Sequence, residues 1–339
     1  MKAAIVTKFG PPEVLKILEW PTPEPAPGEV LIRTKAIGLN FADAFARMGR
    51  YPSVPEPPFI PGIELSGKIE RVGIGVRGFR KGERVGAVRK HEAYAEYVCV
   101  PAAQTMRLPK NMSFEEAAAF PVTYLTAYHG LVTLAHIVSG EKLLLHAAAG
   151  GVGTAAIQLA KHFDAEVYAT ASSSEKLDVA RREGADHLIN YRTEDFSQVI
   201  RSDTDGYGVD VVLDSVGGRV FRKGWKLLAP MGRYVLFGFA AVTGKRRVQK
   251  VRAVRELASI PWIFPPSLVT KNVSLTGFNL FFLMHKTEYL RSTLQEMLKL
   301  YQKRVLRPVI GAKYPFERIA EAQAFLQSRK SAGKVVVVL

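Results

Sequence analysis

Short apolar segments separated by proline and glycine fill the first part of the chain, up to about residue 121. Runs such as Val30–Ala36, Ser66–Val72 and Tyr94–Val100 have the length and the β-branched or aromatic content of strands. Proline-rich connections lie at 21–27 and 52–61. Many short strands at close spacing are typical of a small antiparallel, barrel-like domain. We therefore expect a mainly antiparallel β-barrel domain at the start of the chain.

The pattern changes near residue 122, where strand-length apolar runs begin to alternate with segments of helical periodicity. This alternation indicates an α/β domain with a doubly wound parallel sheet. The expected strands are 142–146, 165–170, 186–190, 209–213, 233–237 and 272–277. A helix is expected near 287–304, and residues 313–339 return to strand, helix and strand. Six strands of this kind match the dinucleotide-binding fold.

The C-terminal tail completes the first domain in this interpretation. We expect residues 1–122 and 305–339 to form the antiparallel domain, which would bind the substrate. Residues 123–304 would then form an inserted domain with a six-stranded parallel sheet. A chain of 339 residues has ample material for two domains with full cores.

A glycine turn directly follows the first strand of the parallel sheet. Residues 142–153 read Lys-Leu-Leu-Leu-His-Ala-Ala-Ala-Gly-Gly-Val-Gly, and a helical pattern starts at Thr154. Glycine lets the backbone approach a pyrophosphate and lets the helix pack close to the sheet, while the free N–H groups of the helix start face the anion. We expect the backbone of Ala149, Gly150, Gly151 and Val152 to bind a dinucleotide.

Composition is that of a globular protein, with 47% hydrophobic and 23% charged residues. No apolar run approaches the roughly 20 residues of a membrane span, and the first residues lack the apolar core of a signal peptide. The single cysteine, Cys99, excludes an internal disulfide framework and any site with several thiolate ligands. These features favour a cytoplasmic enzyme.

The formal net charge of +16 has two interpretations. A basic protein with an anionic cofactor is the simpler one. A basic surface also attracts nucleic acid or anionic lipid without specificity. Since no zinc-finger spacing or aromatic RNA-binding signature accompanies the charge, no specific nucleic-acid partner is expected.

The end of the second parallel strand indicates which coenzyme binds. Folds specific for NAD place Asp or Glu there to bind the ribose hydroxyls, but residues 170–172 contain no acid and Glu175 begins the next helix. Hydroxyls and a cation favour a 2′-phosphate, and Ser172, Ser173 and Lys176 provide them. The structural alternative is a serine that caps the helix and a solvated Lys176. We favour NADPH.

The whole chain resembles the medium-chain dehydrogenase/reductase superfamily, specifically its zinc-free quinone oxidoreductase branch. The segments that carry the resemblance occur in the family's order over nearly the full length. They are Gly38-Leu-Asn-Phe-Ala-Asp, Arg47-Met-Gly-Arg-Tyr, Pro61-Gly-Ile-Glu-Leu-Ser-Gly, Phe120-Pro-Val-Thr-Tyr-Leu-Thr-Ala-Tyr, the glycine turn, Ile189-Asn-Tyr and Ala332-Gly-Lys-Val. Residues 231–283 look closest to the vesicle amine transport protein group. The resemblance implies a GroES-like first domain and a Rossmann second domain.

The resemblance also implies that no zinc takes part. Zinc-dependent relatives hold the metal on Cys and on the His of a Gly-His-Glu motif, whereas this chain has Ile63 in that motif and Asn40 in the region of the first Cys ligand. Zinc needs three or four N, S or O ligands at fixed geometry. The family's ligand set is missing, so we expect no catalytic metal and a structural, hydrogen-bonded Glu64.

Carried over residue by residue, the family pattern assigns further site residues. Tyr191 joins the 2′-phosphate site, and Gly218 lines a neighbouring turn. Contacts to the nicotinamide half of the coenzyme fall on Thr126, Phe237, Gly238, Phe278, Asn279 and Leu280. Tyr51 matches a tyrosine that approaches cofactor and substrate, and Asn40 and Asp43 match an Asn-x-x-Asp pattern. We take Tyr51 as the donor to a substrate carbonyl and Asn40 as a polar pocket group, with loop packing as the alternative for Tyr51 and a structural role for Asp43, which would bind backbone or Arg47.

Residues 244–266 combine many lysines and arginines with Trp262, Ile263 and Phe264. One hypothesis makes the region 245–264 a lid that touches anionic membranes, and the other makes it a solvated helix whose aromatics cover the core. The superfamily commonly forms dimers through the sixth strand, so a homodimer through Asn272–Gly277 is expected. We expect zinc-independent, NADPH-dependent reduction of quinones or α,β-unsaturated carbonyls. The alternative is a cofactor-binding protein of membrane surfaces or nucleic acid with little turnover.

Overall fold

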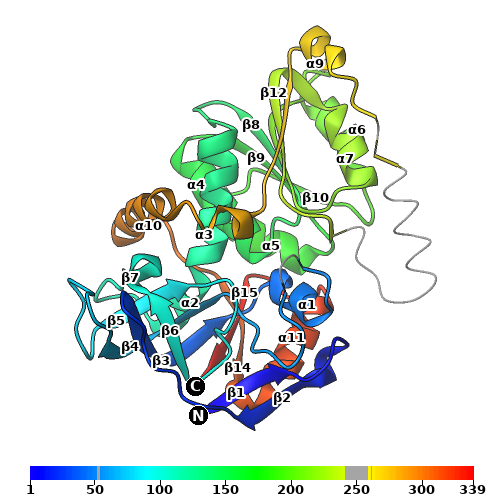
Figure 1. The fold of residues 1–339 in the computed structure, drawn as a ribbon. Coiled ribbons are helices and arrows are strands. Elements are labelled where there is room, and N and C mark those ends of the chain that lie inside the picture. Colours follow the sequence, from blue (N-terminus) through cyan, green and yellow to red (C-terminus); the bar gives the residue numbers. More distant parts are fainter. Residues whose placement is uncertain (52–53, 241–258, 261) are drawn as a thin grey trace. The chain divides into compact units, whose positions relative to one another are not determined.

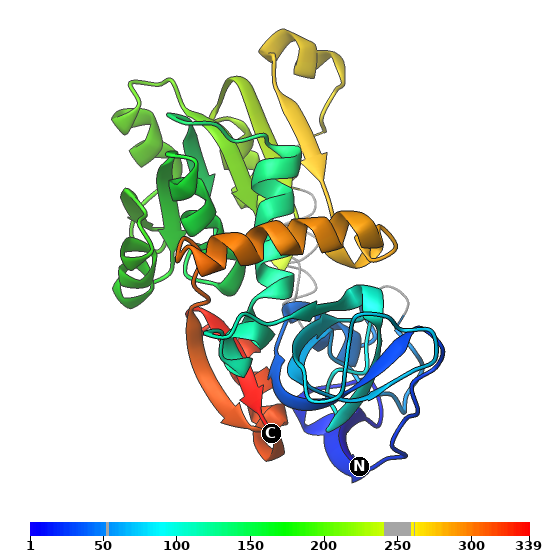
Figure 2. The same cartoon turned by 90° about the vertical axis from the view of Figure 1, so that its left-hand side faces the viewer.

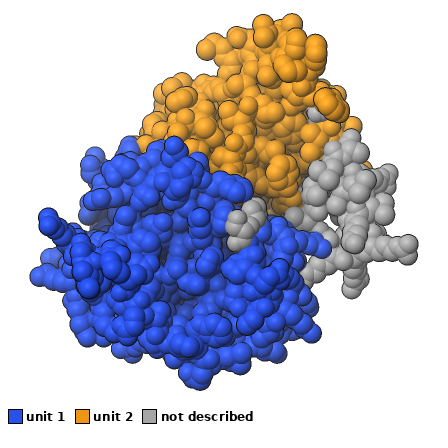
Figure 3. Space-filling view, in the orientation of Figure 1, with its two compact units in different colours: residues 1–125, 281–339 blue, residues 126–280 orange. Residues whose placement is uncertain are grey.

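The computed structural model describes residues 1–51, 54–240, 259–260 and 262–339, and it divides into two compact units. Unit 1 contains Met1–Leu125 and Phe281–Leu339, and unit 2 contains Thr126–Leu280. Figure 3 colours the two units separately. Unit 1 is therefore built from both ends of the chain.

Unit 1 is dominated by a mainly antiparallel sheet in the order β14-β15-β3-β4-β5-β7, with β6 paired to β3 (Figure 1). The strands are β3 (Glu29–Gly38), β4 (Glu64–Val72), β5 (Arg84–Val88), β6 (Tyr97–Pro101), β7 (Thr105–Arg107), β14 (Ile310–Pro315) and β15 (Lys334–Val338). A separate hairpin joins β1 (Lys2–Val6) and β2 (Leu15–Glu19). The alternating core positions of these strands, such as Ile32, Leu65 and Val337, are fully buried.

Five α-helices and four 3₁₀ turns complete the described part of unit 1. They are η1 (Pro12–Val14), α1 (Phe41–Arg47), η2 (Ala102–Gln104), α2 (Phe114–Ala119), α10 (Thr287–Gln302), η6 (Phe316–Arg318) and α11 (Ile319–Gln327), together with α3 (Pro121–Tyr128) and η5 (Leu280–Leu283), which contain the unit boundaries. Ile319 and Leu326 of α11 join the core cluster formed by the strands. In Figure 2 the C-terminal strands β14 and β15 lie side by side, as their parallel register requires.

Unit 2 contains a six-stranded sheet in the order β10-β9-β8-β11-β12-β13, in which every pair is parallel. The strands are β8 (Lys142–Leu145), β9 (Glu166–Ala171), β10 (His187–Asn190), β11 (Val209–Asp214), β12 (Leu228–Leu236) and β13 (Ser274–Gly277). The central strands read as continuous apolar runs because both faces of the sheet are covered. The expected fold class, an antiparallel GroES-like domain with a Rossmann sheet, is confirmed.

Helices cover both faces of this sheet (Figure 1). The helices in the described part of unit 2 are η3 (His129–Leu134, a π-helix), α4 (Gly151–His162), α5 (Ser174–Arg182), α6 (Phe196–Asp203), α7 (Arg219–Trp225) and α9 (Pro266–Lys271). Phe196 of α6 and Phe221 of α7 share a buried cluster with Leu144 and Tyr168 of the sheet. On α4, the small side chains Ala155, Ala156 and Ala160 are completely buried, which permits close packing.

The units differ from the expected domains at residues 123–125 and, over a longer stretch, at residues 281–304; both stretches belong to unit 1. The reason for the longer stretch is the packing of α10. Tyr301 stands edge-on to Phe120 with ring centroids 6.0 Å apart, and its hydroxyl donates to the Asn111 carbonyl at 3.5 Å. β12 also begins at Leu228, earlier than expected, because Leu228 already pairs with Val209. The turn-like Pro230 and Gly232 lie in an irregularity of the strand, and regular pairing resumes at Arg233. Most of the 244–266 segment lies outside the described residues.

Candidate functional site

The glycine turn connects β8 to α4 at the carboxyl edge of the parallel sheet. Gly150 has extended backbone angles and precedes the first helical residue, Gly151. A Cβ on Gly153 would lie 2.4 Å from the Ala148 carbonyl oxygen, whereas one on Gly150 would meet its nearest atom at 3.3 Å. Gly153 is therefore required for packing, and Gly150 leaves its outer side open to a ligand. The first N–H groups of a helix have no intrahelical partner and attract anions, so this turn fits a pyrophosphate.

The expected 2′-phosphate residues come together beside this turn. The Ala148 N–H donates to the Thr170 carbonyl at 3.1 Å, which ties the turn to β9. The Tyr191 N–H donates to the Ala171 carbonyl at 3.1 Å, so Tyr191 and Ser172 follow the adjacent ends of β10 and β9. Tyr191 is exposed, and Lys176 lies half-buried on the first turns of α5. No carboxylate occupies residues 170–172, at the end of β9.

Asp214, which the sequence interpretation missed, shapes the turn that contains Gly218. Its carboxylate accepts hydrogen bonds from the N–H of Val216 at 2.6 Å and of Gly217 at 3.2 Å, and from the Tyr234 hydroxyl at 2.7 Å. Burial and the Asp214 charge raise the pKa of Tyr234 well above its usual value. Gly217 and Gly218 both have positive φ, at 71° and 61°. An acid at a strand end before Gly-Gly is a recognisable signal for such a turn.

The residues expected at the nicotinamide half extend the same sheet edge. The Phe237 N–H donates to the Asp214 carbonyl, and the Phe278 N–H donates to the Leu236 carbonyl. The rings of Phe237 and Phe278 stack with centroids 5.9 Å apart. Gly238 lies against Ser215, where a Cβ would come within 2.8 Å of its carbonyl oxygen. Asn279 and Leu280 continue from Phe278, and Thr126 is buried in α3.

One neutral histidine lies under the glycine turn. His146 is buried, its Nδ1 lies 3.0 Å from the Thr170 hydroxyl, and Nε2 has no hydrogen-bond partner among the described residues. Burial lowers the pKa of His146, so the ring is uncharged at neutral pH. The ring stands edge-on to Phe196, which explains its place in the apolar layer.

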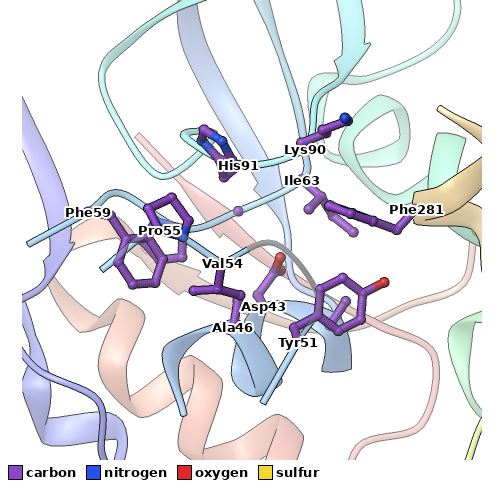
Figure 4. Close-up of a pocket in the computed structure, with 13 residues that line it drawn as sticks. Asp43, Ala46, Tyr51, Val54, Pro55, Phe59, Ile63, Lys90, His91 and Phe281 are labelled. Carbon is purple, nitrogen blue, oxygen red and sulfur yellow. The ribbon is translucent and has the colours of Figure 1, made fainter. Parts of the chain in front are cut away.

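Tyr51 lies in a small pocket of unit 1, together with Asp43 (Figure 4). The Tyr51 ring stands edge-on to Phe281, with centroids 5.2 Å apart. The lining residues are Ala42, Asp43, Ala46, Tyr51, Val54, Pro55, Phe59, Pro61, Gly62, Ile63, Lys90, His91 and Phe281. Most of these side chains are apolar. Asn40 is not among them.

Asn40 instead joins a buried ion pair. Its amide donates to Glu64 at 2.9 Å and accepts from Lys334 Nζ at 2.6 Å. Glu64 is completely buried, forms an ion pair with Lys334, and also accepts from the Val122 N–H at 3.0 Å. Glu64 is thus a structural carboxylate, as expected. Asp43 binds the Asn40 backbone at 2.8 Å, while Arg47 donates to Gln323 and Gln327.

The side chains around Asn40 do not fit a zinc ion. An ammonium group already neutralises Glu64, and the neighbouring residue types are amide, lysine and isoleucine. Nowhere in the described part of the chain do three His, Cys, Asp or Glu side chains form a group able to hold a metal. Cys99 is buried in β6, and burial raises the pKa of its thiol to about 11.

Comparison with known proteins identifies the family. Residues 26–110 match the alcohol dehydrogenase GroES-like domain, and residues 183–337 match a domain described as zinc-binding dehydrogenase. The synaptic vesicle membrane protein VAT-1 homolog of Rattus norvegicus is 37% identical over 100% of this chain and 84% of its own length. The quinone oxidoreductase of Lama guanicoe is 34% identical over 100% of this chain and 98% of its own length.

A solved structure agrees with this relationship. A mycobacterial protein in complex with NADPH superposes with a TM-score of 0.87 at 32% identity, covering 100% of both chains. The fold and the glycine turn define a medium-chain dehydrogenase/reductase. The chain belongs to that superfamily of oxidoreductases, in the branch of VAT-1 homologues and quinone oxidoreductases.

None of the described helices is both long and apolar enough to cross a membrane. Trp262 is fully exposed and Phe264 is largely exposed, and both lie beside the cationic side chains of Arg222, Lys226 and Lys271. The basic residues 245–255 of the same segment lie outside the described residues.

We predict that Gly153→Ala lowers the free energy of unfolding by about 1–3 kcal/mol, because the new methyl group overlaps two carbonyl oxygens and α4 must shift. Gly150→Ala is the matched control and should cost clearly less, because its methyl group meets only one atom, at the edge of normal contact. Urea denaturation followed by circular dichroism measures both. Equal losses for the two variants would contradict the packing role of Gly153.

Proposed function

We propose that this protein is a zinc-independent, NADPH-dependent reductase of quinones or α,β-unsaturated carbonyls. The observation that carries the proposal is the sheet edge of unit 2, where a helix start suited to pyrophosphate is hydrogen-bonded to β9. Ser172 directly follows β9, and Lys176 lies in the next helix, α5. The quinone oxidoreductase among the relatives supports the substrate class. The mycobacterial structure in complex with NADPH supports the coenzyme.

The coenzyme would be held along this edge by residues of unit 2. The N–H groups near Ala149, Gly150, Gly151 and Val152 would bind the pyrophosphate, and Ser172, Lys176 and Tyr191 the 2′-phosphate. Gly218, Phe237, Gly238, Phe278, Asn279, Leu280 and Thr126 would bound the nicotinamide half. When bound, the reduced coenzyme supplies a hydride equivalent.

The protein's own residues would bind the substrate and exclude metal assistance. Tyr51 is proposed to donate a hydrogen bond to the substrate carbonyl from the apolar pocket of unit 1. Asn40 would act indirectly, by holding Glu64 and Lys334 in place. Because Lys334 neutralises Glu64, this position provides no open ligand for zinc.

We predict that Ser172→Asp raises KM for NADPH about tenfold or more, since a carboxylate repels a 2′-phosphate and tenfold corresponds to about 1.4 kcal/mol. KM for NADH should stay the same or fall, because the carboxylate can bind the ribose hydroxyls. Steady-state kinetics with a quinone panel measure both. Ser202→Asp, the same change at an exposed position of α6, is the control.

Equal changes for the two coenzymes in Ser172→Asp would overturn the assignment of the 2′-phosphate site. No turnover of any quinone or enone with either coenzyme would overturn the proposed activity.

A homodimer through Asn272–Gly277 is also proposed. β13 is the edge strand of the parallel sheet, pairs with β12 on one side, and is largely exposed. Such an edge is a template for pairing with a second copy. We predict sedimentation at the dimer mass, and a monomer mass at micromolar concentration would refute it. We propose a cytoplasmic location on the basis of the single, buried cysteine.

A second candidate function is contact with anionic membrane surfaces. Trp262 is fully exposed and Phe264 largely exposed, next to three cationic side chains. Large aromatic groups beside cations are suited to a lipid headgroup region. We predict that Trp262→Ala with Phe264→Ala reduces flotation with phosphatidylserine vesicles, while Phe282→Ala, which removes another exposed aromatic in unit 1, does not. Equal flotation of all forms would remove this candidate.

A further inference from the structure

One carboxylate oxygen of Asp43 accepts two hydrogen bonds, and the other accepts none from the described residues. The side chain is buried, with 1% of its surface exposed. Oδ2 accepts hydrogen bonds from the Asn40 N–H at 2.8 Å and from the Tyr94 hydroxyl at 2.9 Å. Oδ1 is buried and has no hydrogen-bond partner among the described residues. A buried polar atom without a hydrogen bond destabilises the fold, unless a ligand or a water molecule supplies the missing hydrogen bond.

The carboxyl group of Asp43 faces the pocket that also contains Tyr51. In Figure 4 a carboxyl oxygen of Asp43 points toward the centre of the lining residues, below Ile63. Tyr51 and Lys90 direct their polar ends outward in the same view. The enclosed part of the pocket has room for about one water-sized group. An oxygen atom of a larger molecule fits there, with the rest of that molecule at the mouth.

The surroundings favour the neutral acid. Burial raises the pKa of Asp43 to about 7, and this effect outweighs the Asn40 and Tyr94 hydrogen bonds and the charge of Lys334, while the charge of Glu64 acts in the same direction as burial. Lys90 and His91 also line the pocket. Arg47, on the same helix, donates to Gln323, Gln327 and the Gly10 carbonyl. A protonated carboxyl group has a donor to offer, and the described residues provide no acceptor for it.

We propose that Asp43 is a further catalytic residue, which donates a hydrogen bond from Oδ1 to an acceptor oxygen of the ligand in this pocket and gives that oxygen its proton on reduction. The hydrogen bond requires only that the ligand binds and does not depend on turnover. The proton transfer rests on the proposed reductase function. The ligand class is a quinone or enone, whose carbonyl oxygen accepts but does not donate.

The proton step balances with the reactants already named. The hydride, with its two electrons, would pass from the bound reduced coenzyme to the electrophilic carbon of the quinone or enone, where a C–H bond forms. The displaced π electron pair would move to the carbonyl oxygen. The O–H bond of Asp43 breaks, its electron pair stays on the carboxylate, and a new O–H bond forms on the reduced substrate oxygen. A proton from water then restores the acid. Tyr94 is a positioning residue in this scheme, because its hydroxyl holds Oδ2 and leaves Oδ1 for the ligand.

The test separates binding from turnover. Duroquinone is titrated calorimetrically into the coenzyme-free protein from about pH 5.5 to about pH 8.5, and its dissociation constant should rise up to tenfold per pH unit above about 7, because the donor is lost as Asp43 ionises. Asp43→Asn keeps a donor of the same shape that does not ionise. Its affinity should be independent of pH, whereas kcat with NADPH should fall about 100-fold or more because an amide gives no proton.

Two further measurements keep the result decisive. Infrared difference spectra should show a protonated carboxyl band near neutral pH that Asp43→Asn lacks, whatever ligand is present. Tyr51→Phe should keep the pH dependence of duroquinone binding, since Asp43 remains.

The proposal is overturned by a flat pH profile in the unaltered protein, by the same profile in Asp43→Asn, by absence of the infrared band, or by absence of saturable duroquinone binding, which would leave only a bound water at Oδ1. If the protein binds duroquinone with the expected profile but never oxidises NADPH, the proposed function fails while the hydrogen bond from Asp43 stands.

Discussion

The carboxylate of Glu64 is completely enclosed by protein, and its partners come from three other segments of the chain. Removing a carboxylate from water costs several kcal/mol unless paired groups surround it. Lys334 of β15, the Asn40 amide and the Val122 N–H together meet that requirement. The end of β3, the start of α1, the start of α3 and β15 must therefore converge on β4.

This convergence also determines the pocket of unit 1. Asn40 is at once the partner of Glu64 and the residue before α1, and its backbone N–H holds Asp43 on the first turn of that helix. A buried ion pair thus positions a second buried acid, Asp43, which forms no ion pair with any described residue. Glu64 forms an ion pair with Lys334, whereas burial raises the pKa of its neighbour Asp43 to about 7. Carboxyl groups in contrasting environments commonly have different chemical roles.

The sequence predicted the parallel sheet well because its signals are local. Apolar runs, helical periodicity and the glycines near Gly153 lie within short stretches, and five of the six strands begin within two residues of the expected positions. The domain assignment of α10 and the surroundings of Asp43 depend instead on tertiary contacts. The packing of Tyr301 on Phe120 assigns α10 to unit 1, and no pattern in the sequence indicates it. The unpartnered oxygen of Asp43 was equally hidden, because burial and hydrogen bonding depend on residues as distant as Tyr94. The Asp214 turn, by contrast, had a readable signal.

The division of unit 1 between the two ends of the chain has a consequence for synthesis. Asn40 and Lys334 are 294 residues apart in the sequence. During synthesis, Glu64 therefore emerges from the ribosome long before Lys334, its ion-pair partner, has been made. Unit 2 is complete by then, because all of its strands precede residue 281. The buried ion pair of unit 1 can therefore form only after β15 has been synthesised, which makes it a late contact in the maturation of the chain.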